Sequence, residues 1–271
     1  MTVGIVGLGL IGGSIGLALR EPGRKIIGYD PNSDSVKTAI DRGCIDAYAE
    51  LQDVAKTDVV FVAVPPKHTV GTLIAVKAFK RPDTVVSDCT SVKAEVVEWA
   101  EGAREPEFVI GHPMAGHERS GAAFASAWMF RGAKWIICPL KCTSLAAAKK
   151  IEDLVAAMGA TCVRMDASIH DRQIAVVSHL PHAVAGVLVQ LDRGPSEVDV
   201  SGGSWRDLTR VGGVDPALWT QIFMANRVEV SKAIEETQQK LAELKAHLDA
   251  NETEGVWAFF AHARNAKMRS E

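Results

Sequence analysis

The feature that most constrains the fold is a glycine-rich stretch, Gly7-Leu8-Gly9-Leu10-Ile11-Gly12. The apolar run over residues 3–6 precedes it and is rich in β-branched side chains, which indicates a buried strand. Glycines at this spacing allow a tight turn, a close approach of the backbone to a pyrophosphate, and a helix packed on the strand. We expect that helix over residues 14–19, with the unpaired N–H groups of its first turn facing an anion. The stretch therefore predicts the start of a dinucleotide-binding fold.

A carboxylate stands where such a fold binds ribose. A second strand is expected over residues 25–29, and Asp30 follows it directly. An acidic group there repels a 2′-phosphate, and the only basic residue nearby is Lys37, so NAD is favoured over NADP. The alternative interpretation is a glycine-rich turn in an unrelated α/β domain, with Asp30 as a helix cap.

Charge and hydropathy exclude several classes of protein. The net charge of −3 offers no general attraction for nucleic acid or an anionic membrane. No apolar run approaches the length of a membrane span, and residues 1–20 lack the features of a signal peptide. We therefore expect a cytoplasmic protein with a small-molecule substrate.

The cysteines indicate reduced thiols rather than a disulfide framework or a metal site. They are odd in number and scattered, at Cys44, Cys89, Cys138, Cys142 and Cys162. Cys138 and Cys142 form the closest pair, but Pro139 lies between them and no second pair accompanies them. We expect no bound metal.

Strands and helices alternate through the first 164 residues. Further apolar runs, typical of strands buried on both faces, occupy residues 58–64, 84–88, 108–111, 135–139 and 161–164. We expect a parallel, doubly wound sheet of the Rossmann type, in which ligands bind at the carboxyl ends of the strands. The residues expected to contact the dinucleotide are Gly7, Gly9, Leu10, Ile11, Gly12, Asp30, Val64, Pro65 and Ser91.

The composition changes to helix after Asp166. Residues 168–190 have no strand character, a polar glycine-containing stretch covers residues 201–212, and residues 215–250 read as one long amphipathic helix. The apolar positions of that helix are Leu218, Ile222, Ile234, Leu241, Leu244 and Leu248. We therefore expect a dinucleotide-binding domain over residues 1–164 and an all-α domain over residues 165–271 that forms a homodimer.

Three histidines are candidates for chemistry. His112 directly follows a predicted strand, and an imidazole there can accept a proton from an alcohol as hydride leaves. The alternative is a structural histidine bonded to the backbone. His179 and His182 share one face of a predicted helix, without a third ligand at metal spacing. We expect one of them to contact the substrate and the other to pack.

Charged residues in the second half leave alternatives open. Arg206 and Arg210 are four residues apart, and a guanidinium beside glycines suits bidentate capture of a carboxylate. The alternative is a solvated helix-end charge. The residues that either pair over the crevice or face water are Glu118, Arg119, Asp171 and Arg172.

Five ordered motifs resemble the prephenate/arogenate dehydrogenase family over nearly the whole chain. They are Gly7-x-Gly9-x-x-Gly12, Asp88-x-x-Ser91-Val92-Lys93, Gly111-His112-Pro113-Met114-Ala115-Gly116, Ser178-His179-Leu180-Pro181-His182, and Arg206-Asp207-x-Thr209-Arg210 followed by Asp215-Pro216-x-x-Trp219. The resemblance implies an NAD(P)-binding domain joined to a helical dimerisation domain. It also implies oxidative decarboxylation of a cyclohexadienol on the route to tyrosine.

The resemblance carries roles for single residues. It implies that His112 accepts the proton of the ring hydroxyl, that Ser91 orients it, and that Arg210 binds the ring carboxylate. His182 matches a histidine near the substrate side chain. The other substrate-binding candidates are His179, Glu118, Asp171 and Trp219, with the two acidic residues near the entrance.

The choice of substrate depends on His182 in this interpretation. A protonated imidazole would donate to the ketone of prephenate and repel the ammonium of arogenate, which favours prephenate, whereas a neutral one could accept from the ammonium. Arogenate, or both substrates, is therefore the alternative. More distant alternatives are a 3-hydroxyacid dehydrogenase and a non-catalytic NAD-binding sensor.

Overall fold

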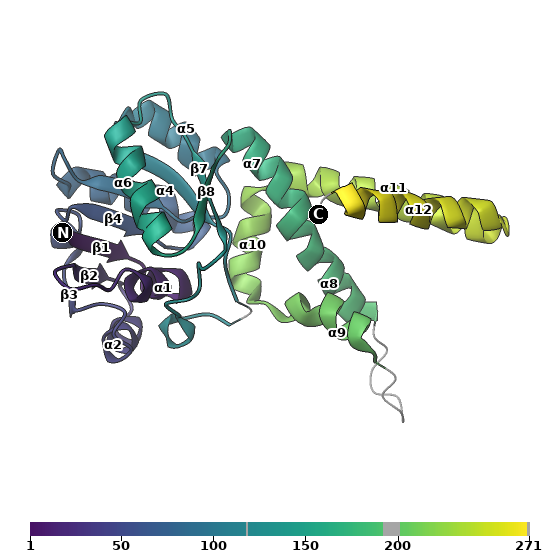
Figure 1. The fold of residues 1–271 in the computed structure, drawn as a ribbon, viewed down its shortest axis with the longest axis horizontal. Helices are drawn as coiled ribbons and strands as arrows, with labels where there is room; N and C mark the ends of the chain where they lie inside the picture. Colours follow the sequence, from purple (N-terminus) through teal and green to yellow (C-terminus); the bar gives the residue numbers. More distant parts are fainter. Residues whose placement is uncertain (118, 192–200, 270–271) are drawn as a thin grey trace. The chain divides into compact units, whose positions relative to one another are not determined.

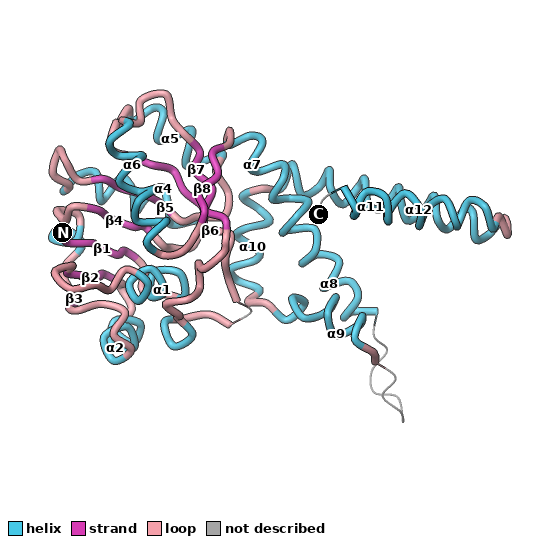
Figure 2. The backbone as a smooth tube through the Cα atoms, viewed as in Figure 1, coloured by secondary structure: helices cyan, strands magenta, loops and turns pink. Residues whose placement is uncertain are grey.

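The computed structural model describes residues 1–117, 119–191 and 201–269, and the chain forms two compact units, residues 1–226 and 227–271. The strands are β1 (Thr2–Val6), β2 (Lys25–Tyr29), β3 (Ala47–Tyr48), β4 (Val59–Val62), β5 (Val85–Asp88), β6 (Phe108–Pro113), β7 (Lys134–Cys138) and β8 (Thr161–Arg164). The helices of the first unit are α1 (Leu10–Ala18), α2 (Ser33–Asp41), α3 (Leu51–Val54), α4 (Pro66–Phe79), α5 (Ala94–Ala103), α6 (Leu145–Ala157), α7 (Ala167–Ile174), α8 (Leu180–Leu191), α9 (Gly203–Thr209) and α10 (Pro216–Ala225). Figures 1 and 2 show this alternation of strands and helices.

The strands form one eight-stranded sheet in the order β3-β2-β1-β4-β5-β6-β7-β8. This is the Rossmann-type arrangement that the sequence predicts, so the predicted fold class is confirmed. The expectation of a wholly parallel sheet is wrong for β7, which pairs antiparallel with β6. The reason lies in the connection over residues 114–133, whose described residues form the short 3₁₀ helix η1 (Ala122–Phe124) and no α-helix. A crossover to a parallel strand usually contains an α-helix that packs on the sheet.

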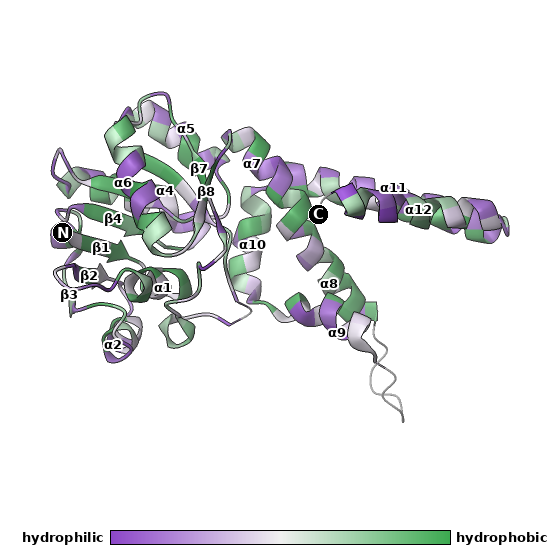
Figure 3. Cartoon of the chain, viewed as in Figure 1, coloured by the Kyte–Doolittle hydropathy of each residue, from purple (hydrophilic) through white to green (hydrophobic). Residues whose placement is uncertain are grey.

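Apolar side chains from alternate strand positions build one core on each face of the sheet. On one face Ile5, Phe61 and Trp135 pack with α1, α2 and α6. On the other face Val60 and Ile110 pack with α3, α4 and α5. In Figure 3 the central strands β1 and β4 appear mostly in the green of hydrophobic residues. Because both faces are covered, the strands lack polar alternation, and the loops at their carboxyl ends are left to carry function.

A continuous helix follows the sheet. Helix α7, a π-helical turn named η2 (Ala175–His179) and α8 run together over Ala167–Leu191. By length and composition alone this helix could cross a membrane, with a mean hydropathy of 1.6 in its most apolar part, so the expectation that no apolar run approaches that length is wrong. Its polar residues hold it to the sheet domain, because Asp171 accepts hydrogen bonds from two backbone N–H groups at the start of α5.

The predicted long helix over residues 215–250 is two helices. Helix α10 ends at Asn226, whose backbone leaves helical geometry at φ −108° and ψ 26°. The buried side chain of Asn226 explains the break, since its Nδ2 donates to the carbonyl of Asp171 at 2.8 Å and lies 3.3 Å from Nδ1 of His179. The polar glycine-containing stretch over residues 201–212 contains α9 and the start of the 3₁₀ helix η3 (Arg210–Gly213).

The second unit is a helical hairpin of α11 (Arg227–Asp249) and α12 (Thr253–Arg269). Its turn contains Asn251 in the left-handed region at φ +56°. Gly255 leaves room for the imidazole ring of His247 on α11, with which a Cβ at this position would overlap. The domain boundary predicted after residue 164 stays a prediction.

Candidate active site

The glycine-rich turn between β1 and α1 has the geometry of a phosphate cradle. Gly7 adopts φ +94°, and a Cβ there would lie 2.4 Å from the carbonyl oxygen of Ala63. A Cβ on Gly12 would lie 1.9 Å from the carbonyl oxygen of Gly7, so the start of α1 can pack on the turn only with glycine at that position. Above Gly9 no atom lies within 4 Å of the Cβ position. The helix N-terminus therefore faces open space, as binding of a pyrophosphate requires.

Asp30 lies at the carboxyl end of β2 with a fixed carboxylate. Its Oδ2 accepts a hydrogen bond from the N–H of Leu8 at 2.8 Å, and its Oδ1 accepts one from the N–H of Asn32 at 2.9 Å. Each carboxylate oxygen can accept a further bond, which fits ribose hydroxyl donors. The turn and Asp30 together fit a dinucleotide.

One cavity of about 910 Å³ connects these groups with the predicted catalytic residues. It lies at the carboxyl ends of the strands and is closed on one side by α10. The predicted site residues that line it are Gly7, Gly9, Leu10, Ile11, Asp30, Val64, Pro65, Ser91, His112 and Trp219. Gly12, His179, His182, Asp171 and Arg210 are not among the residues that line it.

His112 is a buried titratable group that lines this cavity. It belongs to β6, its side chain is buried, and its Nδ1 lies 2.8 Å from Nε2 of His170. Burial lowers the pKa of His112 well below the ordinary value, and the charge of Lys93 lowers it further. His112 is therefore neutral near pH 7 and can accept a proton. Ser91, half-buried, lines the same cavity.

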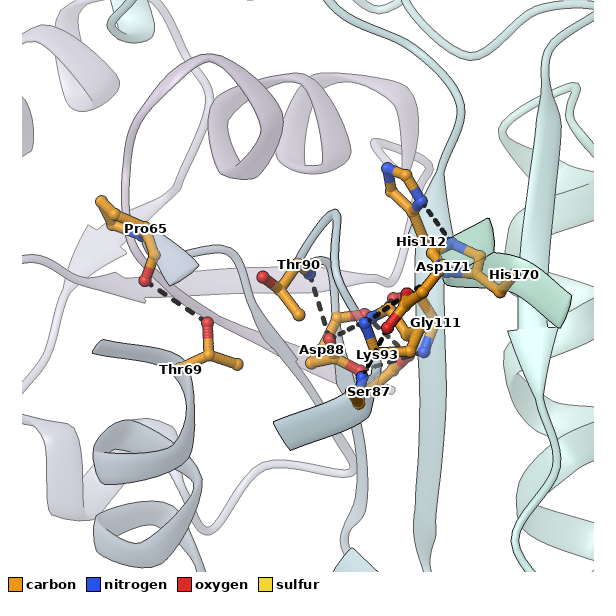
Figure 4. A network of polar contacts seen from close by, with 11 residues as sticks. Pro65, Thr69, Ser87, Asp88, Thr90, Lys93, Gly111, His112, His170 and Asp171 are labelled. Atoms are coloured by element: carbon orange, nitrogen blue, oxygen red, sulfur yellow. Dashed lines mark hydrogen bonds and ion pairs between the residues drawn. The ribbon is translucent and has the colours of Figure 1, made fainter. Parts of the chain in front are cut away.

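Behind His112 a buried ion pair fixes the backbone. Nζ of Lys93 lies 2.6 Å from Oδ2 of Asp88 and also donates to the carbonyl of Gly111. Oδ1 of Asp88 accepts the N–H of Gly111 at 3.0 Å. Both side chains are fully buried, and Figure 4 shows them packed against the strand that carries His112. This cluster holds the residue before His112 by both its N–H and its carbonyl.

Asp171, in α7, is buried against the start of α5 and does not line the cavity, although the resemblance implied a position near the entrance. Its Oδ1 accepts the N–H of Lys93 at 2.8 Å and its Oδ2 the N–H of Ala94 at 2.9 Å. Oδ1 also lies 2.7 Å from Nδ1 of His170. His170 therefore lies between this carboxylate and His112.

His182 and Trp219 form a stacked pair. Their ring centroids are 3.6 Å apart at an interplanar angle of 25°. Nδ1 of His182 lies 2.8 Å from the carbonyl oxygen of Ser178. Because a carbonyl only accepts, Nδ1 carries a proton. Burial lowers the pKa of His182 and the charge of Arg210 lowers it further, so Nε2 is an unprotonated acceptor near neutral pH.

His179 packs behind this pair. Its side chain is buried, and its ring stands nearly perpendicular to that of Trp219, with centroids 6.2 Å apart. Burial lowers its pKa to about 4, so it is neutral at pH 7. Arg210 is exposed at the start of η3, and Arg206 lies one turn earlier in α9. Glu118 lies outside the described residues.

Comparison with known families decides the identity of this site. The family described as "Prephenate dehydrogenase, nucleotide-binding domain" matches residues 15–164, and "Prephenate dehydrogenase, dimerization domain" matches residues 166–262. The chain belongs to the prephenate dehydrogenase family. The predicted family and the predicted class of enzyme, an NAD-dependent dehydrogenase of this family, are thereby confirmed.

Relatives agree over most of their length. A prephenate dehydrogenase of Bacillus subtilis is 30% identical, with 97% of this chain and 74% of the relative covered. The crystal structure of prephenate dehydrogenase from A. aeolicus, in complex with hydroxyphenyl propionate and NAD+, is 33% identical and has a TM-score of 0.90, covering 100% of this chain and 98% of that one. Synechocystis arogenate dehydrogenase is 25% identical, with a TM-score of 0.83 and full coverage of both chains. The family is therefore clear, and its members include enzymes named for prephenate and an enzyme named for arogenate.

Three residues of this dehydrogenase site, Asp88, Lys93 and His170, have no role that the sequence analysis predicts. Asp88 and Lys93 stand in a motif quoted for the resemblance, and a buried Asp and Lys five residues apart after a strand could have indicated the ion pair. His170 is adjacent to Asp171, but no spacing links it to His112, 58 residues away along the chain. Only the fold brings these two rings together.

Proposed function

We propose that this chain catalyses the NAD-dependent oxidative decarboxylation of prephenate to 4-hydroxyphenylpyruvate. The observation that carries the proposal is the cavity in which His112 and Ser91 meet the glycine-rich turn and Asp30. A neutral, buried imidazole beside a dinucleotide site suits removal of a hydroxyl proton during hydride transfer. The relatives named prephenate dehydrogenase support this choice of substrate.

In this mechanism His112 first accepts a proton from the substrate and later returns it to the product. NAD held by the glycine-rich turn and Asp30 would supply the acceptor for the hydride from the ring carbon that carries the hydroxyl. His112 takes the hydroxyl proton as the carbonyl forms, and Ser91 orients that hydroxyl. When the ring carboxylate leaves as CO₂, its bonding electrons make the ring aromatic and generate a phenolate, to which His112 returns the proton. No net proton is lost, so the base is regenerated in each turnover.

Arg210 has a binding role in the proposal. Its guanidinium would pair with the ring carboxylate and orient it. A strong ion pair in the ground state alone would oppose decarboxylation, because the transition state disperses that charge. An exposed position at the start of η3 lets solvent weaken the pair, which suits a group that binds a carboxylate about to leave.

A second candidate substrate is arogenate, and His182 is the observation that favours it. With Nδ1 bonded to the carbonyl of Ser178, the Nε2 lone pair is the group that a ligand beside Trp219 would meet. A lone pair accepts from an ammonium and offers nothing to a ketone. The donor role that the sequence interpretation gave to His182 therefore has less support than the acceptor role.

We also propose NAD rather than NADP, because Asp30 would repel a 2′-phosphate. For assembly we propose a homodimer through the helical region, as the name of the matched dimerization domain suggests. Large apolar side chains exposed on a single chain support it, among them Val177, Leu191, Leu241 and Leu248. A cytoplasmic location is in keeping with five cysteines that are all free thiols.

Absorbance at the nicotinamide band tests the proposed function. The enzyme with NAD should produce reduced cofactor with prephenate, with arogenate or with both, and none with simple 3-hydroxy acids. Turnover of a 3-hydroxy acid alone would indicate the wider hydroxyacid dehydrogenase group. NAD binding without turnover of any of these compounds would indicate a sensor.

A further inference from the structure

Three side chains form a hydrogen-bonded chain that ends at the cavity. Nδ1 of His112 lies 2.8 Å from Nε2 of His170, and Nδ1 of His170 lies 2.7 Å from Oδ1 of Asp171. Figure 4 shows the chain, with the second ring nitrogen of His112 pointing away from His170. His170 is fully buried, and Asp171 and His112 are 5% and 8% exposed. Water therefore does not compete for these bonds.

The direction of each hydrogen bond follows from Asp171. Its Oδ1 accepts the N–H of Lys93 and its Oδ2 the N–H of Ala94, so both oxygens are acceptors and the group is a carboxylate. His170 must then donate through Nδ1, and in the neutral ring its Nε2 is left with a lone pair. A lone pair on Nε2 of His170 requires a proton on Nδ1 of His112. In a neutral ring, the lone pair of His112 is then on Nε2.

We propose that His170, oriented by Asp171, is a positioning residue that holds His112 in the one neutral tautomer able to act as base toward the cavity. This inference rests on the proposed function, in which His112 accepts the hydroxyl proton. Without His170 as acceptor, the ring could carry its proton on Nε2, and that tautomer has no lone pair for the substrate. A wrong tautomer is costly even when the geometry of a catalytic histidine is intact.

The charged and titratable groups around these three hydrogen-bonded side chains fit this role. Lys93, from the segment before α5, and His179, from η2, both lower the pKa of His112, so a cation is not stabilised before substrate arrives. When His112 does accept a proton, its Nδ1–H still has an acceptor in His170. Asp171 then supplies a negative charge on the side of His170 that faces away from His112. The ring keeps its orientation in both protonation states.

Nitrogen NMR of the whole chain labelled with ¹⁵N-histidine tests the tautomer directly and needs no activity. The resonances of His112 are assigned as those lost in His112→Asn. We expect the shift of a protonated Nδ1 and an unprotonated Nε2 in the unmodified protein. Protonated Nε2 on neutral His112 would overturn the proposal. Because this readout is independent of turnover, it decides the tautomer even if prephenate and arogenate both prove not to be substrates.

Two variants at His170 test the consequence for turnover. His170→Phe removes the acceptor, and we expect kcat to fall at least ~10-fold, with KM for NAD nearly unchanged. In the NMR spectrum, His112 should shift toward protonated Nε2. His170→Gln offers a side-chain oxygen to Nδ1 of His112 and should recover most of kcat and the original tautomer. A merely structural role for His170 predicts equal losses in both variants and an unchanged tautomer, and that result would overturn the proposal.

Discussion

Nζ of Lys93 lies 2.6 Å from Oδ2 of Asp88, and both side chains are completely buried. The two residues are five positions apart in the sequence, and both bond Gly111 on the neighbouring strand. Lys93 donates to the carbonyl of Gly111, and Asp88 accepts from its N–H. The ion pair therefore links the carboxyl ends of β5 and β6 and places a fixed positive charge near His112.

Lys93→Met should move the acid limb of kcat/KM to higher pH. The charge of Lys93 lowers the pKa of His112, and activity is lost as pH falls through that pKa. Removing the charge raises the pKa, so the loss begins at a higher pH. The variant also leaves Asp88 buried without its ion-pair partner, which should lower the free energy of unfolding by about 3–5 kcal/mol. The double variant Asp88→Asn with Lys93→Met avoids that loss and should show the same shift; an acid limb that stays in place in both variants would contradict this role.

Asp30→Ser should narrow the preference for NAD over NADP. The carboxylate bonds ribose hydroxyls and repels a 2′-phosphate, and losing a charged hydrogen bond is worth about 10- to 100-fold in kcat/KM. Steady-state kinetics with both cofactors measure the ratio. Asp34→Ser, an exposed carboxylate on α2, is the matched control and should leave the ratio unchanged. An unmodified enzyme that uses NADP as well as NAD would rule out this role for Asp30.

His182→Ala should lower kcat/KM for arogenate more than for prephenate, by about tenfold. The reason is the unprotonated Nε2, which can accept from the ammonium of arogenate alone. Kinetics with both substrates give the ratio, and His262→Ala, an exposed histidine of α12, controls for loss of an imidazole elsewhere. A larger loss with prephenate would instead support His182 as a donor to the ketone.

The double variant Leu241→Glu with Leu248→Glu should dissociate the homodimer. Each leucine is 59% exposed on the single chain, and both lie on the stripe that the sequence predicts for the dimer contact. Sedimentation at micromolar concentration should give a dimer for the unmodified chain and a monomer for the variant. Glutamate at Gln238 and Gln239, which are already polar and exposed, is the control. A monomeric unmodified protein would refute the assembly.

The sequence predicts best where local chemistry requires a particular residue. Gly7 and Gly12 have no room for a Cβ, and Asp30 follows its strand at the spacing that ribose binding needs, so the dinucleotide site can be predicted from the chain. His112 could be predicted for a similar reason, because it comes at the end of a buried strand. Ser91 follows the same rule at the end of β5.

What the sequence could not predict depends on tertiary contacts. The apolar run of β7 looks the same in either direction, and the described residues of the connection over 114–133 lack the α-helix that usually leads to a parallel strand. Asn226 breaks a helix with continuous helical periodicity, because its side chain bonds the backbone of Asp171. His170 reads as an ordinary polar residue until the fold sets it against His112. These two side-chain contacts join residues that are 55 and 58 positions apart.

The central claim is that His112 is the base of a dinucleotide-dependent oxidation, and His112→Asn tests it most directly. The measurement is kcat for reduction of NAD with prephenate and with arogenate, made beside calorimetric binding of NAD. We predict that His112→Asn lowers kcat at least ~100-fold with the preferred substrate. NAD binding should stay within about twofold, and His262→Asn should behave as the unmodified enzyme. A His112→Asn enzyme that keeps its kcat while binding NAD would contradict the account.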